Sequence, residues 1–396
     1  MNLVGIIAEY NPFHNGHIYH IKETIKKTNP DLVIAVISGP FTQQGNIAIL
    51  DKFSRSKIAS LYGADIVIEI PFVFASSSAE FFAKASINIL NALNVNIVSF
   101  GSEEENIDTL IKTAKNILNN KDQINKLIKK YLKEGLSYTK SYILATEESL
   151  NLDNSNLFKS NNILALEYIK ELIRLNSQIK PCSIHRIYND YNENALSNSV
   201  FTSATSIRKS LRTVGNLPSV KKFVPEEIYS ELEQSLICNN SNMYDILRYK
   251  IIINKDNLKN IHEVSEGFEN RIYNNVLQYN NYEDFINNTI TRRFTLPKLK
   301  RILIKILLDI NKEDFNKIDI QNDLYARILY MNDKAKKHIG TIVKNSKIPV
   351  ITKLNNKTLD SLSLNQKYLI NKDIEANNLW NIINKKNLNT DFTNKL

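Results

Sequence analysis

The sequence predicts an α/β protein in which a parallel sheet is followed by a mainly helical second part. Short runs of apolar, β-branched residues alternate with helical patterns through the first half of the chain. Runs that are apolar at almost every position suit strands buried on both faces. Strands and helices that alternate at this spacing favour a parallel sheet with right-handed crossovers. Beyond Gly215 the alternation stops and helical patterns dominate.

The expected elements follow one another in a regular order. The first four strands are expected over residues 3–8, 32–37, 66–70 and 96–100. Helices are expected between them, over residues 16–28, 52–62 and 79–93. Two further helices, over residues 106–135 and 157–176, precede a fifth strand at residues 182–187. After Pro225, stretches such as EEIYSELEQSLI and LPKLKRILIKILLDI have the periodicity of helices.

A domain boundary is expected where the pattern changes. The chain of 396 residues is longer than a typical single domain. Gly215, Pro218 and Pro225 mark the change and are typical of a connecting segment. We therefore expect one domain over residues 1–215 and a second, mainly helical domain over residues 216–396.

Composition limits the classes of partner. The net charge is +10, and most of the excess lies in residues 216–396, which is compatible with a polyanionic partner but also with an ordinary lysine-rich surface. Cys182 and Cys238 are too few for a disulfide framework. A secretion leader and an apolar run of membrane-spanning length are both absent from the sequence. We expect a cytoplasmic protein with reduced thiols and no membrane partner.

The stretch AEYNPFHNGHIYH, residues 8–20, holds three of the six histidines directly after the first strand. Pro12 and Gly16 make a regular helix unfavourable before residue 15 or 16. His14 is therefore expected in a turn, and His17 and His20 in the following helix. In an open parallel sheet this is the ligand-binding edge, where a helix also presents free N–H groups.

The spacing H-x-G-H favours a phosphate-binding site. His14 and His17 can both point imidazole N–H groups at a phosphate chain, and Gly16 lets the backbone come close to it. Such donors would stabilise charge on an α-phosphate as pyrophosphate leaves. A zinc site needs three or four convergent ligands, and the glutamate or fourth histidine expected at metalloprotease spacing is missing, so no resident metal is expected. A plain surface or core role stays open, above all for His20.

A second phosphate candidate lies in FTSATSIRKSL. Ser203 and Thr205 stand where a helix would begin, with Arg208 and Lys209 one turn further on. Hydroxyl groups at a helix start and a nearby guanidinium suit a β- or γ-phosphate. Alone this signal is weak, because serine and threonine cap helices of every kind. Its value lies in its pairing with H-x-G-H.

Together these motifs carry a resemblance to a known family. HNGH and TSATSIR resemble the signatures of the HxGH nucleotidyltransferase superfamily, whose Rossmann-like domain transfers AMP from ATP. The ordered set VGIIAEYNPFHNGHIYHI, SGPFTQQGNIAI, GADIVIEIPFVFA, SFGSE, SNNILALEYIK and HRI is similar to the tRNA(Met) cytidine acetate ligases. The resemblance covers residues 1–215 with specific motifs. Over residues 216–396 it extends only to length and helical character.

The resemblance implies a two-step reaction. ATP and acetate would give acetyl-adenylate, and the acetyl group would then pass to the wobble cytidine of elongator tRNA(Met), forming N4-acetylcytidine. The catalytic residues would be His14 and His17. Magnesium would arrive with the triphosphate. The implied ATP-binding residues, with the second phosphate candidate added, are Ile7, Ala8, Glu9, Tyr10, Asn11, Pro12, Phe13, His14, Asn15, Gly16, His17, His20, Gly101, Asn162, Arg186, Ile187, Ser203 and Thr205.

In this set Gly101 would allow close approach of the adenosine, and Arg186 would supply charge or a stacking plane. Asn161 is an alternative to Asn162, and both could instead cap a helix that begins at Ile163.

The chain departs from the family pattern at one place. Where S-G-x-F-x-Q-R-G-E is expected, Gln44 replaces an arginine and Asn46 replaces a glutamate. If the two family residues only pair with each other, the joint loss is nearly neutral. If the arginine holds acetate, phosphate or RNA, activity would suffer, because Gln44 can donate a hydrogen bond but carries no charge.

A basic stretch in the second half is the candidate RNA surface. Residues 285–308 contain no acidic side chain and could neutralise several phosphates. The expected RNA-binding residues are Arg292, Arg293, Lys298, Lys300 and Arg301. Lys305 belongs to the same stretch, and some of these cations could merely solvate the outer face of a helix. A cluster at residues 334–338 is a weaker candidate.

Two other classes of function stay open. One is an HxGH adenylyltransferase acting on a small phosphorylated cofactor precursor, although such enzymes are usually single compact domains. The other is a non-catalytic RNA-binding relative. Acetate dependence distinguishes the ligase from the cofactor adenylyltransferase. ATP turnover distinguishes both enzymes from the non-catalytic RNA-binding relative.

Overall fold

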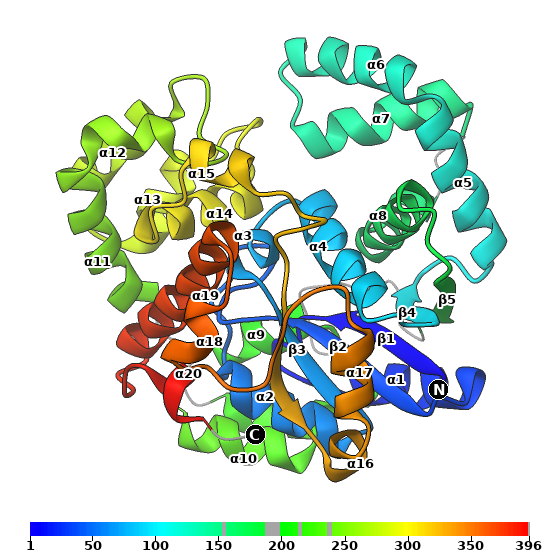
Figure 1. Ribbon diagram of the computed structural model, residues 1–396. Coiled ribbons are helices and arrows are strands. Elements are labelled where there is room, and N and C mark those ends of the chain that lie inside the picture. Colours follow the sequence, from blue (N-terminus) through cyan, green and yellow to red (C-terminus); the bar gives the residue numbers. More distant parts are fainter. Residues whose placement is uncertain (153–155, 187–198, 213–215, 236–239, 395–396) are drawn as a thin grey trace.

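The chain folds around one seven-stranded sheet (Figure 1). The computed structural model describes residues 1–396 except 153–155, 187–198, 213–215, 236–239 and 395–396. The strand order is β5-β4-β1-β2-β3-β6-β7. The strands are β1 (Leu3–Ala8), β2 (Leu32–Ser38), β3 (Ile66–Ile70), β4 (Ile97–Ser102), β5 (Lys180–His185), β6 (Ala326–Met331) and β7 (Val350–Ile351).

The first five strands are parallel, and the expected α/β fold class is confirmed. The four strands expected first lie within a residue or two of their predicted bounds. The fifth begins at Lys180, two residues earlier than expected. Strand β2 lies on one side of β1 and β4 lies on its other side, so the order in which strands are added to the sheet changes direction at β1. The end of β1 is therefore a topological switch point.

The second half of the chain is mainly helical but also extends the sheet. Strand β6 pairs antiparallel with β3, with Glu69 opposite Arg327, and β7 pairs parallel with β6. The sequence predicted a mostly helical pattern from Pro225 onward, and these two strands were not predicted. The division at residue 215 stays a proposal, and the sheet spans both of its parts.

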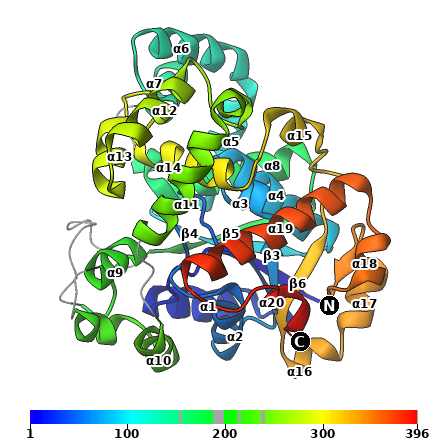
Figure 2. The same ribbon diagram turned by 90° about the vertical axis from the view of Figure 1, so that its left-hand side faces the viewer.

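Helices cover both faces of the sheet (Figure 2). Alternate strand residues such as Ile6 and Val33 pack in one core with the helices of one face. Their neighbours, such as Ile7 and Ile34, pack in a second core on the other face. Helices α1 (Asn15–Thr28), α2 (Lys52–Leu61), α9 (Ala204–Leu211) and α10 (Glu226–Gln234) cover the first face. The other face is covered by α3 (Phe72–Ala75), α4 (Ala79–Ala92), α8 (Ser160–Arg174) and α19 (Leu364–Ile383).

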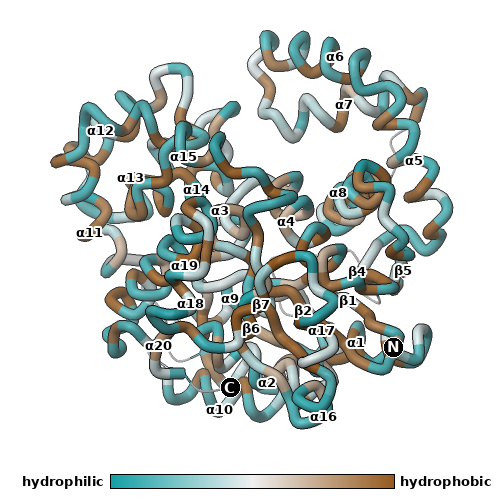
Figure 3. Tube along the Cα trace, viewed as in Figure 1, coloured by the Kyte–Doolittle hydropathy of each residue, from teal (hydrophilic) through white to brown (hydrophobic). Residues whose placement is uncertain are grey.

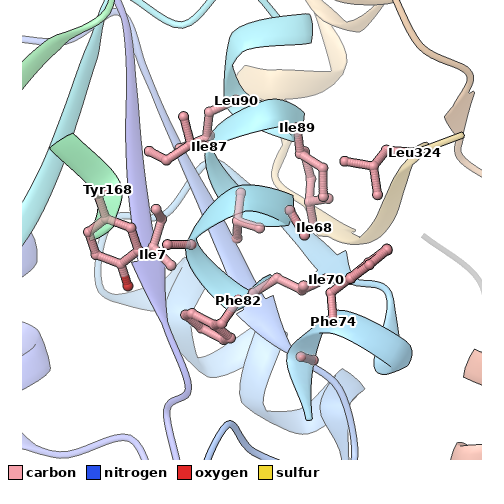
Figure 4. Packing of buried hydrophobic residues seen from close by; sticks show 14 of the residues in the cluster. Ile7, Ile68, Ile70, Phe74, Phe82, Ile87, Ile89, Leu90, Tyr168 and Leu324 are labelled. Carbon is pink, nitrogen blue, oxygen red and sulfur yellow. The ribbon is translucent and has the colours of Figure 1, made fainter. Parts of the chain in front are cut away.

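Figure 4 shows the second of these cores, where Phe82, Ile87 and Leu90 of α4 lie against the strands. The side chain of Leu90 also fills the space above Gly5, where an added Cβ would lie 2.7 Å from its Cδ1. Apolar residues gather on the sheet and polar residues on the outer helices (Figure 3). In the part of the chain that is described, no helix has the length and apolar character needed to cross a membrane.

Two helical groups stand above the carboxyl edge of the sheet (Figure 1). The first is α5 (Ile107–Asn119), α6 (Lys121–Lys133) and α7 (Tyr138–Leu150). A helical stretch was expected over residues 106–135, and α5 and α6 lie within it. The second has a core of its own and comprises α11 (Asn240–Ile253), α12 (Phe268–Gln278), α13 (Tyr282–Thr289) and α14 (Leu296–Leu307). Shorter helices follow at α15 (Lys312–Lys317), α16 (Asp333–Lys336), α17 (Ile339–Asn345), α18 (Asn356–Asp360) and α20 (Thr390–Thr393).

A buried ionic cluster joins the end of the chain to the sheet. Lys52 Nζ lies 2.8 Å from both Glu69 Oε2 and Asp391 Oδ1. Arg327 pairs with the same two carboxylates. Nearby, the indole N–H of Trp380 donates to the Ala48 carbonyl at 2.7 Å. These contacts fix β6, α19 and α20 against β3 and α2.

Candidate active site

The HNGH motif forms the turn from β1 into α1. His14 is the N-cap residue, with extended backbone, and its Nδ1 accepts a hydrogen bond from the Gly16 N–H at 3.1 Å. The His14 N–H donates in turn to Nδ1 of His17 at 3.2 Å, and the two rings stack with centroids 3.8 Å apart. A neutral imidazole that accepts at Nδ1 carries its proton on Nε2. Both rings therefore present an Nε2–H donor.

Both histidines are neutral at physiological pH. Burial lowers the pKa of His14 to about 3, and the charges of Arg186 and Arg208 act in the same direction. Burial also holds the pKa of His17 well below its usual range, helped by His14 and Arg186. The pair thus offers directed N–H donors rather than positive charges.

His20 has a different place from its two neighbours. Its Nε2 lies 3.2 Å from the Ser99 hydroxyl on β4, and Ser99 also bonds the Thr24 hydroxyl at 2.6 Å. Burial lowers the pKa of His20 to about 4. His20 thus links α1 to β4, which favours the structural interpretation left open for it.

The residues before the motif pack under the turn and fix its conformation. Ile7 and Ala8 end β1, and the buried rings of Tyr10 and Phe13 pack edge-on against each other. Tyr10 has a positive φ of 51°, and the Asn11–Pro12 peptide is cis. Asn11 Oδ1 accepts from the Ile49 N–H at 2.9 Å, which ties the turn to the segment before α2.

Asn15 connects the turn to the second phosphate candidate. Its side-chain amide donates to the carbonyls of Val200 and Lys222 at 3.0 and 2.9 Å. The start of α9 is thereby held beside the start of α1, as the pairing of the two motifs predicted.

Within α9, Ser203 is the N-cap residue and accepts from the Ser206 N–H at 3.0 Å. The Arg208 guanidinium donates to the Thr205 hydroxyl at 3.0 Å and to the Asn11 carbonyl at 2.6 Å. Arg208 thus reaches the HNGH turn itself, whereas Lys209 is exposed. The sequence signal for this candidate was the pair of hydroxyls at the helix start with Arg208 and Lys209 one turn on, and its phosphate-binding role stays a prediction.

The proposed adenosine end of the site lies after β4. The buried Asn162 accepts at Oδ1 from the Ser102 hydroxyl at 2.7 Å and from the Glu103 N–H at 2.9 Å, so it orders the loop that follows Gly101. Asn161 donates to Glu103 and accepts from Arg186 at 3.4 Å. Helix α8 begins at Ser160 with Lys159 as its N-cap, so neither asparagine is the N-cap.

Gly101 leaves open space at the strand end. An added Cβ there would lie 3.5 Å from Cγ of Arg186, an ordinary contact that would nevertheless fill the space between the backbone and this side chain. Arg186 continues β5 by one residue, since its N–H donates to the Ser102 carbonyl at 3.1 Å. Ile187, the last residue implied here, lies outside the described residues.

One functional candidate was missed in the sequence. Arg55 of α2 is fully buried and donates to the carbonyls of Glu9 at 2.6 Å, Ser38 at 3.1 Å and Gly39 at 2.5 Å. It therefore ties the carboxyl ends of β1 and β2 together beneath the turn. Burial lowers its pKa to about 10, which leaves it charged at neutral pH. The segment KFSRSKIAS gave no sign that this arginine is the buried one.

The departure from the family pattern lies in the loop of residues 41–47. Asn46 Oδ1 accepts from Lys300 Nζ of α14 at 2.9 Å, whereas Gln44 is exposed. Gly45 has φ 71°, and an added Cβ would lie 2.6 Å from the Arg301 nitrogen, so only glycine fits where the loop meets α14. Position 46 thus faces a lysine of the second half. A glutamate there would form an ion pair with Lys300.

The basic stretch does not form one continuous surface. Arg301 and the buried Lys305 share Glu263 as ion-pair partner at 2.8 and 2.7 Å, so both cations are engaged inside the protein. Arg293 pairs with Glu266 and donates to the Leu132 carbonyl of α6.

The other cations of this stretch have separate places. Lys298 lies over the ring of Phe294 at 4.0 Å, Lys300 contacts Asn46, and Arg292 is exposed. Arg292 and Arg293 also line a cavity of about 320 Å³ together with Phe268 and Phe294. In the described ranges, His, Cys, Asp and Glu side chains do not form a group of three or more that could hold a metal ion.

This fold and this pair of histidines define a nucleotidyl transferase. The sequence matches the HIGH Nucleotidyl Transferase family over residues 1–395. A tRNA(Met) cytidine acetate ligase of Clostridium perfringens (strain ATCC 13124) is 40% identical, with 99% of this chain and 98% of that protein covered. One from Clostridium acetobutylicum is 37% identical, with 97% and 96% covered. The chain therefore belongs to the tRNA(Met) cytidine acetate ligase family.

Solved structures agree with this assignment. The crystal structure of Thermotoga maritima TmcAL bound with alpha-thio ATP superposes with a TM-score of 0.84 at 31% identity, covering 97% of this chain and 95% of that one. The apo form of the same protein gives a TM-score of 0.87 at 32% identity over the same shares. The likeness extends over both halves of the chain, so it includes the region where the sequence motifs were weak.

Proposed function

We propose that this protein is an ATP-dependent ligase that activates acetate as acetyl-adenylate. It then transfers the acetyl group to the wobble cytidine of elongator tRNA(Met) and forms N4-acetylcytidine. The observation that carries the proposal is the stacked pair His14 and His17, whose Nε2–H donors stand at the start of α1. Full-length relatives named for this reaction support it.

The site fits a nucleoside triphosphate. Neutral N–H donors and the free N–H groups of the first turn of α1 suit phosphate oxygens. Arg208 stands beside this turn and would hold the β- or γ-phosphate together with the hydroxyls at the start of α9. The space at Gly101 between the backbone and Arg186 suits the adenosine. The ATP-binding residues named above keep their proposed roles on these grounds.

The first step needs charge stabilisation more than proton transfer. A carboxylate oxygen of acetate attacks the α-phosphorus, the bond to the β-phosphate oxygen breaks, and pyrophosphate leaves with the electron pair. The Nε2–H donors of His14 and His17 would stabilise the charge on the α-phosphate, and Arg208 would stabilise the leaving group. Buried donors act strongly here because little water competes with them. Magnesium would enter with the triphosphate rather than on a set of protein ligands.

The tRNA would approach the side where α9 and α14 face the loop of residues 41–47. Lys300 lies there, and burial lowers its pKa to about 8, with the charges of Arg212 and Arg208 acting in the same direction. Cations that lower one another's pKa favour binding of an anion between them. We propose Lys300 and the exposed Arg292 as phosphate contacts. Arg293 and Lys298 stand beside them, and Arg301 supports the helix from within.

The protein is proposed to work in the cytoplasm, where its tRNA and ATP are found. The test of the function is incorporation of labelled acetate into a transcript of elongator tRNA(Met) with ATP and magnesium. A matched transcript with uridine at the wobble position lacks the exocyclic amine and serves as the control. Label on the cytidine transcript alone is expected. Equal label on both transcripts, or label on neither, would overturn the proposal.

A further inference from the structure

The transfer step requires a group that accepts a proton. When the N4 amine of cytidine attacks the acetyl carbonyl, a C–N bond forms, the C–O bond to AMP breaks, and AMP leaves with the electron pair. The nitrogen must then lose one proton. This amine is weakly basic, because its lone pair is delocalised into the ring, so a positioned base would accelerate the step.

The two histidines of the motif are unsuited to this role. The Nδ1 lone pair of each ring is already used as an acceptor, by the Gly16 N–H in His14 and by the His14 N–H in His17. Each Nε2 already carries a proton. Accepting another proton would break the capping contacts that begin α1. The histidines therefore act as donors throughout.

Two other carboxylates near the carboxyl ends of the central strands are also engaged. Glu69, at the end of β3, is buried between Lys52 and Arg327. Glu103, after β4, accepts from the Asn161 amide and from the Asn162 N–H. Both are held by partners whose loss would disturb the fold or the loop after Gly101.

Glu9 differs from both. It follows β1 directly, is half-buried, and accepts at Oε1 from the Gln43 N–H at 2.7 Å. Its Oε2 takes no hydrogen bond and forms no ion pair among the described residues. One oxygen is thus fixed by the loop of residues 41–47 while the other is available to a proton.

Neighbouring groups shift the pKa of this carboxyl but, within the described part of the chain, leave its Oε2 atom without a hydrogen bond. Burial raises its pKa, whereas the Gln43 N–H, Arg208 and Arg55 oppose the rise. Arg55 donates to the carbonyl of Glu9 itself, and Arg208 donates to the Asn11 carbonyl, so both guanidinium groups are bonded to backbone rather than to the carboxylate. Burial raises the pKa of Tyr168 of α8, and the charge of Glu9 acts in the same direction. A carboxyl whose pKa moves toward neutrality is suited to act as a general base.

Glu9 directly follows the last residue of β1, at the carboxyl edge of the sheet where the HNGH turn begins. Ile7, two residues earlier in β1, packs beneath α4, and the alternation of the strand carries Glu9 to the same side. Ser99, His20 and the start of α1 belong to the opposite face, which is the proposed nucleotide side. The loop that binds Glu9 continues to Asn46 and its contact with Lys300.

We propose that Oε2 of Glu9 takes the proton from the cytidine amine as the acetyl group is transferred. The inference rests on the proposed function, because it concerns the second step of that reaction. It adds a catalytic role in the second step to the ATP-binding role proposed for Glu9.

The test measures the transfer step alone. Preformed acetyl-adenylate is mixed with excess enzyme and tRNA, and single-turnover transfer is followed from pH 5 to pH 9. Glu9→Gln keeps the acceptor for the Gln43 N–H but removes the basic oxygen. We expect its transfer rate to fall by about 10²- to 10⁴-fold, with loss of the rise in rate with pH that the wild type shows. Glu9→Asp keeps a carboxylate and should retain that pH dependence at a reduced rate.

Glu105→Gln is the matched control, because this glutamate is exposed and, among the described residues, pairs with His185 alone, at 3.5 Å. Binding of tRNA to Glu9→Gln, measured by filter retention, should stay within about two-fold of wild type, which separates a lost base from lost binding. If the wild type transfers acetyl and Glu9→Gln does so at the same rate and with the same pH profile, the role of Glu9 is overturned and the proposed function stands. If the wild type transfers none, both are overturned.

Discussion

At the scale of single residues, the site depends on histidines that stay neutral. The H-x-G-H spacing predicted that His14 and His17 would converge, and the hydrogen bonds of their Nδ1 atoms show how the convergence is held. Pro12 and Gly16 delay the helix, which predicted that His14 lies in the turn and His17 and His20 in the helix, as α1 shows. Arg55 could not be predicted, because burial of a single arginine depends on which backbone carbonyls the fold brings around it.

A pH dependence of stability follows from these histidines. The pKa of His14 is about 3 in the folded protein, below the 6.5 of a free histidine, so the unfolded chain binds more protons between these values. The contribution of His14 to the free energy of unfolding is therefore fully present above pH 6.5 and is lost as the pH drops toward 3. From pH 6.5 to pH 5, His14 alone should cost roughly 1–2 kcal/mol of the free energy of unfolding.

Urea unfolding at the two pH values checks this. His14→Asn should reduce the difference between the two free energies of unfolding, because asparagine does not titrate. The exposed His338 provides the control, since His338→Ala should leave the difference as it is. An unchanged pH dependence in His14→Asn would contradict the neutral, buried state of this ring.

At the scale of elements, the cations of α14 have two different roles. Arg301 and Lys305 point inward to Glu263, whereas Lys300 contacts the loop of residues 41–47. Composition alone predicted a basic helix with an apolar stripe, and both features are present. It could not show which cations are paired, because their partner Glu263 lies 38 residues before Arg301 in the chain.

Substitutions in α14 should separate the two tasks. Lys300→Ala should weaken tRNA binding and reduce the slope of log K against log salt by about 1, because one phosphate contact is lost. Arg301→Ala should instead lower the free energy of unfolding, because Glu263 loses one of its two partners inside the protein. Salt-dependent binding titrations and urea unfolding of both variants check this. A Lys300→Ala variant with an unchanged salt slope would remove Lys300 from the RNA surface.

At the scale of the molecule, the two halves of the chain share one sheet. The alternation of strands and helices predicted the parallel part with good bounds, because strands buried on both faces leave a clear pattern. Strand β6 was missed because its pairing with β3 is antiparallel and comes from a distant segment in a helical context. The pairing depends on the buried carboxylates Glu69 and Asp391, whose partners in space are not neighbours in sequence.

The ionic cluster predicts a strong effect of one substitution. Arg327→Met would leave Glu69 and Asp391 with Lys52 as their shared buried partner, which should cost about 3–5 kcal/mol of the free energy of unfolding. The protein has one tryptophan, Trp380, which bonds to Ala48 across the two halves, so its fluorescence reports the docking of α19. A loss below about 1 kcal/mol would mean that the cluster does not hold β6 in place.

The central claim is that the histidine pair supports adenylation of acetate. The measurement that tests it most directly is exchange of labelled pyrophosphate into ATP with magnesium, with and without acetate and with and without tRNA. The wild type should exchange only with acetate. His17→Ala should lose about 10²- to 10³-fold of that rate by removal of one donor, while His338→Ala keeps it. No exchange under any of these conditions, or full exchange in His17→Ala, would contradict the account.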